Sequence, residues 1–232
     1  MACKALMGAA LLVASLGVGA AEQTDAAGDP WEGFNRAVFT FNDTLDRYAV
    51  KPLAQGYHWI TPDIIETGVG NFFDNLADVG TALNNLLQGK VAEASTDVAR
   101  VVFNSTIGLA GVIDVATPMG LQEHDEDFGQ TLGVWGMDSG PYLVLPFFGP
   151  SSVRDGIGLV ADYAVDPLRQ VDDQGAQNAL YALRVLDTRV DLLKAEELVT
   201  GDRYIFIRDA YLQRRKFSIS DGKAIDYDDS NF

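Results

Sequence analysis

The sequence predicts an all-α protein, a single domain of amphipathic helices that is interrupted by one irregular segment. Apolar residues recur at spacings of three and four over most of the chain, which is the period of a helix with one apolar face. Capping residues and prolines mark where several of these stretches begin. Residues 128–155 instead carry two apolar runs bounded by Gly and Pro, so they form a bent element and not one long helix.

Charge and composition exclude several classes of function. The 232 residues include 33 acidic and 17 basic side chains, for a formal net charge of −16. Such an excess of negative charge opposes binding to nucleic acid and broad adhesion to anionic membrane faces. The hydrophobic fraction of 47% is too high for a disordered chain. We therefore expect a folded protein with no nucleic-acid partner.

The first 21 residues indicate an export signal. Lys4 precedes an apolar run from Ala5 to Gly17, and small residues follow as far as Ala21. This order of charge, apolar run and small residues is typical of a cleaved secretory signal. We expect a signal peptide over residues 1–21, a helical domain over residues 22–217, and an acidic, flexible tail over residues 218–232.

The single cysteine and the apolar runs bear on membrane attachment. Cys3 precedes the apolar run of the signal, whereas a lipoprotein signal has its cysteine directly after that run, where Ala21 stands here. This argues against a covalent lipid anchor and leaves the mature chain without disulfides. The most apolar later stretch, residues 140–150, is too short for a membrane span and contains three prolines. Membrane contact would therefore need amphipathic or re-entrant pieces.

Two helices are expected in the N-terminal part of the domain. Asp29-Pro30 can cap the first, which should run to about Tyr48 and end at Lys51-Pro52. Its aromatic stripe fits either a buried core or a belt at a membrane interface. Thr61-Pro62 should begin the second helix, which continues to Gly89. The stripe of the first helix comprises Phe34, Val38, Phe41, Leu45 and Tyr48.

Residues 91–103 have the clearest helical period. Their apolar positions should face inward and their charged positions outward, as in a surface helix of a water-soluble protein. The expected inner residues are Val91, Ala94, Val98, Val101 and Val102. The expected outer residues are Glu93, Asp97 and Arg100.

Three further helices are expected after residue 150. A short one spans about residues 153–164, with Ile157, Val160 and Ala161 facing inward. A long one spans about residues 176–199, and the last begins near Tyr204 and ends near Phe217. Residues 104–119 should be buried or form a short re-entrant turn. Strand-like alternation is confined to residues 131–135 and 142–147.

The chain lacks the residue patterns of a catalytic, metal or cofactor site. His124 lies in an acidic run, residues 123–127, but zinc sites need several His or Cys ligands at set spacing, so a solvated loop is favoured. There is no G-x-S-x-G nucleophile motif, and the glycines after Phe128 lack the lysine of a phosphate-binding loop. We expect no enzyme activity, no cofactor and no metal.

A series of motifs, ordered along the chain, resembles the MlaA/VacJ family. Before this resemblance is considered, residues 128–155 fit a buried loop of a soluble domain as well as an apolar element that contacts lipid. The motifs are DPWEGFNRAVFTFNDTLD (29–46), KPLAQGY (51–57), NFFDNL (71–76), NNLLQGK (84–90), FNSTIGLAGVIDVA (103–116), FGQTLGVWG (128–136), GPYLVLPFFGPSSVRD (140–155) and YIFIRDAYLQRR (204–215).

The resemblance implies a helical ring with a re-entrant segment, lying monotopically in the outer membrane at its periplasmic face. It implies a protein that removes mislocalised phospholipids from the outer leaflet through an amphipathic channel and so maintains lipid asymmetry. The implied partners are a periplasmic lipid carrier of the MlaC type and a trimeric porin. Family members commonly carry a lipoprotein signal, and Ala20-Ala21 depart from it. The membrane hold would then rest on the amphipathic ring and on the porin.

Under this hypothesis the irregular segment lines the lipid path, and Phe41-Asn42 on the first helix pack against it. Its glycines permit tight bends, its aromatic residues contact acyl chains, and Arg154 contacts the headgroup or pairs with a nearby carboxylate. The alternative is a non-transporting envelope scaffold that binds porins. The candidate lipid-path residues are Phe41, Asn42, Gly129, Gly133, Trp135, Gly136, Gly140, Tyr142, Phe147, Phe148 and Arg154.

Overall fold

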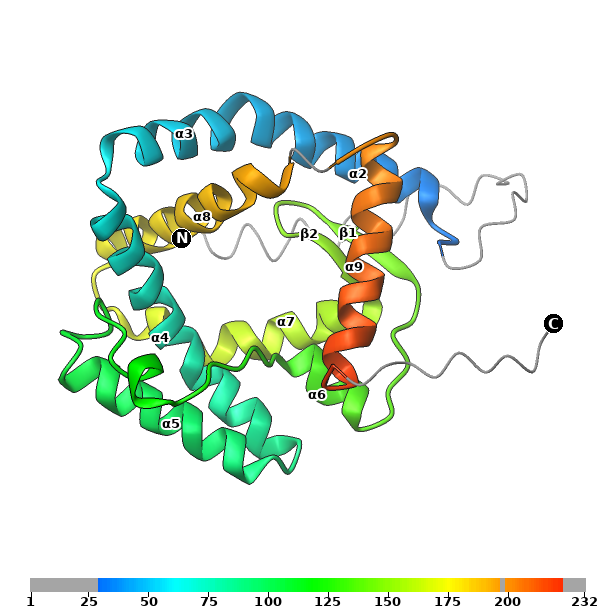
Figure 1. Ribbon diagram of the computed structural model, residues 1–232. Coiled ribbons are helices and arrows are strands. Elements are labelled where there is room, and N and C mark those ends of the chain that lie inside the picture. The colour runs from blue at the N-terminus through cyan, green and yellow to red at the C-terminus, as the bar shows by residue number, and fades with distance from the viewer. Residues whose placement is uncertain (1–28, 197–198, 223–232) are drawn as a thin grey trace.

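The computed structural model describes residues 29–196 and 199–222, and its helices follow one another around a ring (Figure 1). The all-α prediction is confirmed, because strands in the described part are confined to one short hairpin. The elements are α2 (Glu32–Leu45), a π-helical turn (Asp46–Val50), α3 (Lys51–Ile60), α4 (Asp63–Leu87), α5 (Val91–Thr106), α6 (Phe128–Val134), β1 (Tyr142–Leu145), β2 (Gly149–Ser152), α7 (Val153–Val165), α8 (Gln174–Ala195) and α9 (Arg203–Ile219).

Contacts between neighbouring elements close the ring. In Figure 1, α3 lies beside α8, α4 descends to α5, and α6 and α7 pack together below α9. The hairpin completes the circuit, since β1 contacts α2 and β2 contacts α9. The expected signal peptide and the end of the acidic tail, residues 223–232, lie outside the described residues.

The apolar core is small and sits at the hairpin. Tyr142, Val144 and Tyr204 form it, and Val38 and Phe39 of α2 pack against it. Elsewhere the buried positions are mostly polar, while many large apolar side chains are exposed. The buried polar residues between α4, α5 and α6 include Asn75, Asp78, Thr81, Asn84, Asn85, Asp97, Arg100, Asn104, Gln130 and Thr131.

The predicted orientation of α5 is wrong. Asp97 and Arg100, expected outside, are 0% and 2% exposed, whereas Val91 and Val98, expected inside, are 61% and 53% exposed. Of the expected inner residues, Ala94 is buried. A helical period identifies the residues that share a face, but the surroundings decide which face turns inward.

α7 is inverted in the same way. Ile157 and Val160, which were expected to face inward, are exposed, and Arg154, Asp155 and Gly158 are buried instead. The aromatic stripe of α2 is likewise largely exposed. The buried residue of this helix is Asn35, which is not part of the stripe. Of the two interpretations of that stripe, the structure excludes a wholly buried core.

The expected helix end at Lys51-Pro52 is also wrong. α2 continues through the π-helical turn into α3, and the Lys51 amide donates to the carbonyl of Asp46, five residues back. The wider turn gives the Pro52 ring room that a regular helix would deny it. The chain therefore stays helical through Pro52, although a proline usually ends a helix.

Residues 131–134 are helical, contrary to their strand-like alternation, because Asp127 caps α6 by accepting from the Gln130 amide. Residues 142–147 do supply a strand, β1, which pairs antiparallel with β2 in the register Leu143–Ser151. The helices expected over residues 61–89 and 176–199 correspond to α4 and α8. Among the described residues, none of the helices has both the length and the apolarity that crossing a membrane requires.

Candidate functional site

The hairpin is held by two asparagines of α2. Asn35 accepts from the Val144 amide at 2.9 Å and donates to the Tyr142 carbonyl at 3.0 Å. Asn42 accepts from the Phe147 amide and donates to the Leu145 carbonyl, both at 2.9 Å. The expected packing of Phe41-Asn42 against this segment is therefore confirmed.

An aromatic tip, which we define as Phe147 and Phe148 with the adjoining Phe41, stands at the turn of the hairpin. Phe147 and Phe148 are 63% and 69% exposed. The rings of Phe41 and Phe147 meet edge to face, with centroids 5.4 Å apart. Phe147 has a positive φ of 69°, which is uncommon for a residue with a side chain. The Asn42 contact thus holds a strained turn that presents aromatic rings outward.

Gly129 and Gly133 lie within α6 and do not make bends, contrary to the expectation. Gly129 faces Gly158 of α7, where a Cβ at Gly158 would lie 2.4 Å from the Gly129 nitrogen. Gly133 faces Ile219 and Arg154 at 3.0 and 3.1 Å from a Cβ position. These glycines allow helices to approach closely. Gly136 and Gly140 do have positive φ, and the chain turns there toward β1.

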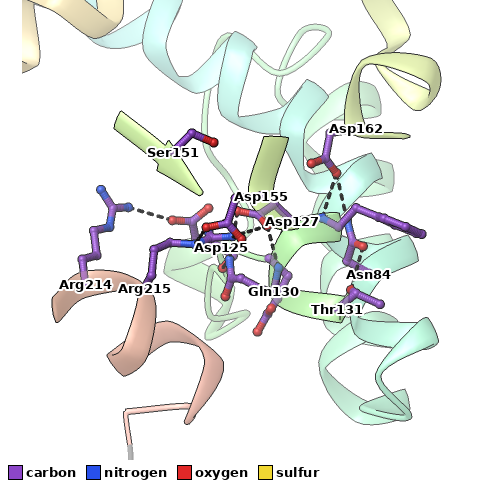
Figure 2. A network of polar contacts seen from close by, with 12 residues as sticks. Asn84, Asp125, Asp127, Gln130, Thr131, Ser151, Asp155, Asp162, Arg214 and Arg215 are labelled. Atoms are coloured by element: carbon purple, nitrogen blue, oxygen red, sulfur yellow. Dashed lines mark hydrogen bonds and ion pairs between the residues drawn. The ribbon is translucent and has the colours of Figure 1, made fainter. Parts of the chain in front are cut away.

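An ion network joins α6, α7 and α9 (Figure 2). Arg215 donates to Asp155 at 2.8 Å and to Asp127 at 2.9 Å. Arg154 donates from two nitrogens to the same Asp155, at 2.9 and 3.0 Å, and Tyr211 also donates to Asp155. Burial by itself would raise the pKa of Asp155, but hydrogen bonds from Arg215 and Tyr211 hold it at about 2. Asp155 therefore remains charged.

A second branch of polar contacts reaches α4 (Figure 2). The Thr131 hydroxyl donates to Asn84 at 2.8 Å, and Asp162 accepts from the Phe128 amide at 2.9 Å. Burial raises the pKa of Asp162 to about 6. Buried polar contacts thus run from α4 through α6 to α9.

Two of the expected lipid-path side chains are buried. Tyr142 lies in the core against Tyr204, so it presents no ring to an acyl chain in this structure. Arg154 is 5% exposed and engaged by Asp155, which is the structural role that was weighed against headgroup contact. Trp135 is exposed, and its ring nitrogen donates to the Leu87 carbonyl at 3.1 Å.

α4 and α5 are joined by polar contacts. Asn85 donates to Asp97 at 2.7 Å, and Arg100 donates to Asp78 at 3.1 Å. Burial raises the pKa of Asp78 to about 6 although the nearby Arg100 opposes this shift. Polar contacts between helices with apolar outer faces are typical of helices in an apolar medium.

A second group of carboxyls gathers between α4 and α8. Asp187 is buried and accepts a hydrogen bond from the Tyr57 hydroxyl at 3.5 Å. Burial first, and then the charges of Asp191 and Glu66, raise the pKa of Asp187 to about 6. Asp74 is exposed at the surface, yet its pKa is also raised to about 6. The first cause is the loss of solvation near surrounding protein atoms, and the second is the charge of neighbouring carboxylates.

Several of these polar residues were missed from the sequence. Asn35, Asn84 and Thr131 were absent from the candidates, although each holds two segments together. The signal that could have found Asn84 is a polar stripe within an apolar helix, at residues 78, 81, 84 and 85 of α4. In the described ranges, His, Cys, Asp and Glu form no group that could hold a metal ion.

Two cavities open on the described surface. The larger, of about 410 Å³, is lined by Lys51, Gln55, Leu193, Glu196, Val199 and Arg203. The smaller, of about 280 Å³, is lined by Ala92, Glu93, Thr96, Gly120, Gln122 and His124. Neither is bounded by residues 128–155.

Comparison with known proteins gives consistent matches. Residues 27–218 match the family model described as MlaA lipoprotein. An uncharacterized protein of Rickettsia typhi is 36% identical over 195 residues, which cover 82% of this chain and 78% of that protein. The intermembrane phospholipid transport system lipoprotein MlaA of Escherichia coli K12 is 34% identical over 223 residues, covering 94% of this chain and 88% of that protein.

A solved structure agrees over most of the chain. It is described as the "Structural basis for maintenance of bacterial outer membrane lipid asymmetry". The match has a TM-score of 0.72 at 33% sequence identity, and it covers 82% of this chain and 98% of that chain.

Proposed function

The chain belongs to the MlaA lipoprotein family, and from this premise we propose that it removes mislocalised phospholipids from the outer leaflet of the outer membrane. As a member of this family it is a lipid-transport component and not an enzyme. The transport maintains the lipid asymmetry of that membrane.

The observation that carries the proposal is the inverted burial of the helices. Val91 and Val98 of α5 and Ile157 and Val160 of α7 face outward, while the charged faces of the same helices are buried. In water this arrangement forfeits about 25 cal/mol for each Å² of apolar surface left exposed. In hydrocarbon it is favourable, and a helix lying in the plane of the interface needs no spanning segment.

The ring therefore lies in the inner leaflet, at the periplasmic face of the outer membrane. Its outer apolar surface contacts the acyl chains of neighbouring lipids. Ala20-Ala21 stand where the lipid-bearing cysteine of a lipoprotein would be. The apolar surface would then hold the protein at the membrane without a covalent lipid.

The lipid path runs along residues 128–155 and the Phe41-Asn42 contact. A phospholipid has a charged head and two acyl chains, so its path needs both polar and apolar walls. The aromatic tip and Trp135 offer exposed apolar contact along this path. Gly136 and Gly140 shape the turn between them.

The path ends at a periplasmic carrier of the MlaC type, which takes the lipid from this chain. A trimeric porin is the second partner, and it meets part of the exposed apolar surface. Both partners follow from the family resemblance. The apolar outer faces of α5 and α7 are the physical feature that a porin contact would use.

Deletion of the gene tests this function. We expect more phospholipid in the outer leaflet, measured by labelling of surface-exposed headgroups, and greater sensitivity to detergent with chelator. Expression of the full chain should restore both. An unchanged outer leaflet in the deletion strain would contradict the proposal.

A porin-binding scaffold without transport is separated from a conduit by crosslinking. A photoreactive residue at Trp135 or Phe147 should capture phospholipid if these positions contact the lipid path. Asp172, an exposed loop position, provides the control. A scaffold would capture porin and no phospholipid at either position.

A further inference from the structure

Three cationic side chains converge on Glu196, which directly follows α8: they are Lys51 of α3, Arg189 of α8 and Arg203 of α9. Lys51 Nζ lies 3.1 Å and Arg189 Nη2 2.7 Å from its Oε2 atom. Arg203 Nη1 lies 3.1 Å from Oε1. With Asp46 beside Arg189 and Asp43 beside Arg203, this cluster holds three cations and three carboxylates.

The three cations differ in how fully they are used. Arg189 also binds Asp46 through two nitrogens, at 2.7 and 2.9 Å, so its guanidinium is occupied. Arg203 has a second carboxylate, Asp43, at 3.4 Å, but its buried Nε has no hydrogen-bond partner. Glu196 is the carboxylate that Lys51 contacts among the described residues. Donor capacity thus remains at Lys51 and Arg203.

The cavity of about 410 Å³ opens at this point, and we call it the cationic cavity. Lys51 and Arg203 form its charged wall, and Leu193 and Val199 form an apolar wall. The π-helical turn ends directly before Lys51. Such turns interrupt a regular helix and are frequent at functional sites.

Glu196 behaves as a permanent internal anion. The hydrogen bond from Arg189, opposed by burial and aided by those from Lys51 and Arg203, lowers the pKa of Glu196 to about 2. The side chain therefore stays charged at any pH the cell meets. It occupies the position at which the donors of the cavity would meet an external anion.

We propose that the cationic cavity binds a phosphate group, carried by a phospholipid headgroup or free, and that Glu196 is the internal anion which this phosphate displaces. Lys51 and Arg203 would donate to phosphate oxygens, for which ammonium and guanidinium groups are suited. Exchange of one anion for another keeps the local charge balanced. The headgroup form of the proposal rests on the proposed function, and Leu193 and Val199 then face the apolar part of the lipid.

Binding by the full chain in detergent micelles tests the proposal. The probes are short-chain phosphatidylethanolamine, inorganic phosphate, and short-chain diacylglycerol, which lacks phosphate. Lys51→Gln and Arg203→Gln should each weaken phosphatidylethanolamine binding about tenfold, because each removes a charged donor. Lys51→Arg should retain binding.

The direction in which Glu196→Gln changes the binding affinity decides the proposal. Removal of the competing carboxylate should tighten binding about tenfold, an effect that misfolding cannot imitate. Arg184→Gln is the matched control for the two cation variants, since Arg184 lies on α8 but pairs with Asp166, outside the cavity. Unchanged or weaker binding by Glu196→Gln would overturn the proposal, as would equal binding of diacylglycerol.

The remaining arms separate the sources and the two proposals. Inorganic phosphate that binds as tightly as phosphatidylethanolamine would overturn the headgroup source. If all variants bind phosphatidylethanolamine like the wild type, the cationic cavity is rejected while the proposed function stands. If the deletion strain also keeps a normal outer leaflet, the proposed function fails by its own test.

Discussion

Asn35 and Asn42 lie seven residues apart on one face of α2, and each makes the same pair of hydrogen bonds with successive parts of the hairpin. Each amide accepts from one backbone N–H and donates to one backbone carbonyl. α2 therefore satisfies the free edge of β1 as a neighbouring strand would. The spacing of two helical turns matches the two contacts along the extended chain.

Asn35→Ala and Asn42→Ala should separate the two contacts. Asn35 is buried, so its loss leaves unpaired groups at Tyr142 and Val144 and should cost about 2 kcal/mol of unfolding free energy. Asn42 is more exposed, and its loss should cost about 1 kcal/mol. Hydrogen exchange should accelerate at the Val144 amide in the first variant and at the Phe147 amide in the second. Equal acceleration at both amides in both variants would contradict separate contacts.

Gly158→Ala should be strongly destabilising. The added Cβ would lie 2.4 Å from the nitrogen and 2.7 Å from the Cα of Gly129, and backbone atoms cannot move aside cheaply. We expect a loss of about 3 kcal/mol, measured by chemical unfolding. Gly33→Ala is the control, because it lies in α2 with open space around it and should stabilise by about 0.5–1 kcal/mol. A neutral Gly158→Ala would contradict the close contact of α6 with α7.

Asp187 should make the protein less stable as the pH rises through about 6. Its pKa is raised in the folded state by burial, so folding favours the protonated carboxyl. That contribution is present below the unfolded pKa of 3.8 and is lost above the folded value. Asp187→Asn should therefore add on the order of 1 kcal/mol to the unfolding free energy at about pH 7.5 and nothing below about pH 3.

Asp172→Asn removes one negative charge from an exposed loop and controls for net charge. Melting curves of the three proteins across this pH range provide the comparison. If Asp172→Asn and Asp187→Asn gave the same pH dependence, long-range repulsion and not local burial would be the cause.

Trp59 and Ile60, at the corner between α3 and α4, should contact lipid. Their side chains are 86% and 73% exposed, so no protein neighbour covers most of their surface. Trp59→Ser with Ile60→Ser should weaken binding to phospholipid vesicles at least about tenfold, since burial of each large apolar side chain contributes about 2 kcal/mol. Flotation with vesicles measures this binding, and the melting temperature without vesicles should stay unchanged. Full vesicle binding by the double variant would place the membrane contact elsewhere.

Replacement of the glycines in the irregular segment should have different effects at different positions. Gly133 faces Ile219 and Arg154, so a β-branched residue there disturbs the packing of α6 before it affects any lipid. Gly136 has open space but a positive φ of 91°. Its replacement strains the turn alone. Gly136 is therefore the better position at which to separate lipid passage from folding.

The positions of most helices could be predicted because their causes are local. Pro62 and the terminating Gly89 act within a few residues, and they placed α4 close to its observed bounds, although the N-cap is Pro62 and not Thr61. Pro52 misled because the π-helical turn that accommodates it depends on a hydrogen bond that no composition reveals. Residues 131–135 misled because seven residues of helix are too few to show their period.

By itself, the sequence determined the amphipathic stripes and the family resemblance. Only the tertiary structure decided that Asp97 and Arg100 turn inward while Val91 and Val98 turn outward. A period of 3.6 residues is unchanged when the helix is rotated about its axis, so it defines a face without defining what that face meets. The partners that decide the rotation, such as Asp78 for Arg100 and the hairpin for Asn35, come from other segments, and for Asn35 from more than a hundred residues away.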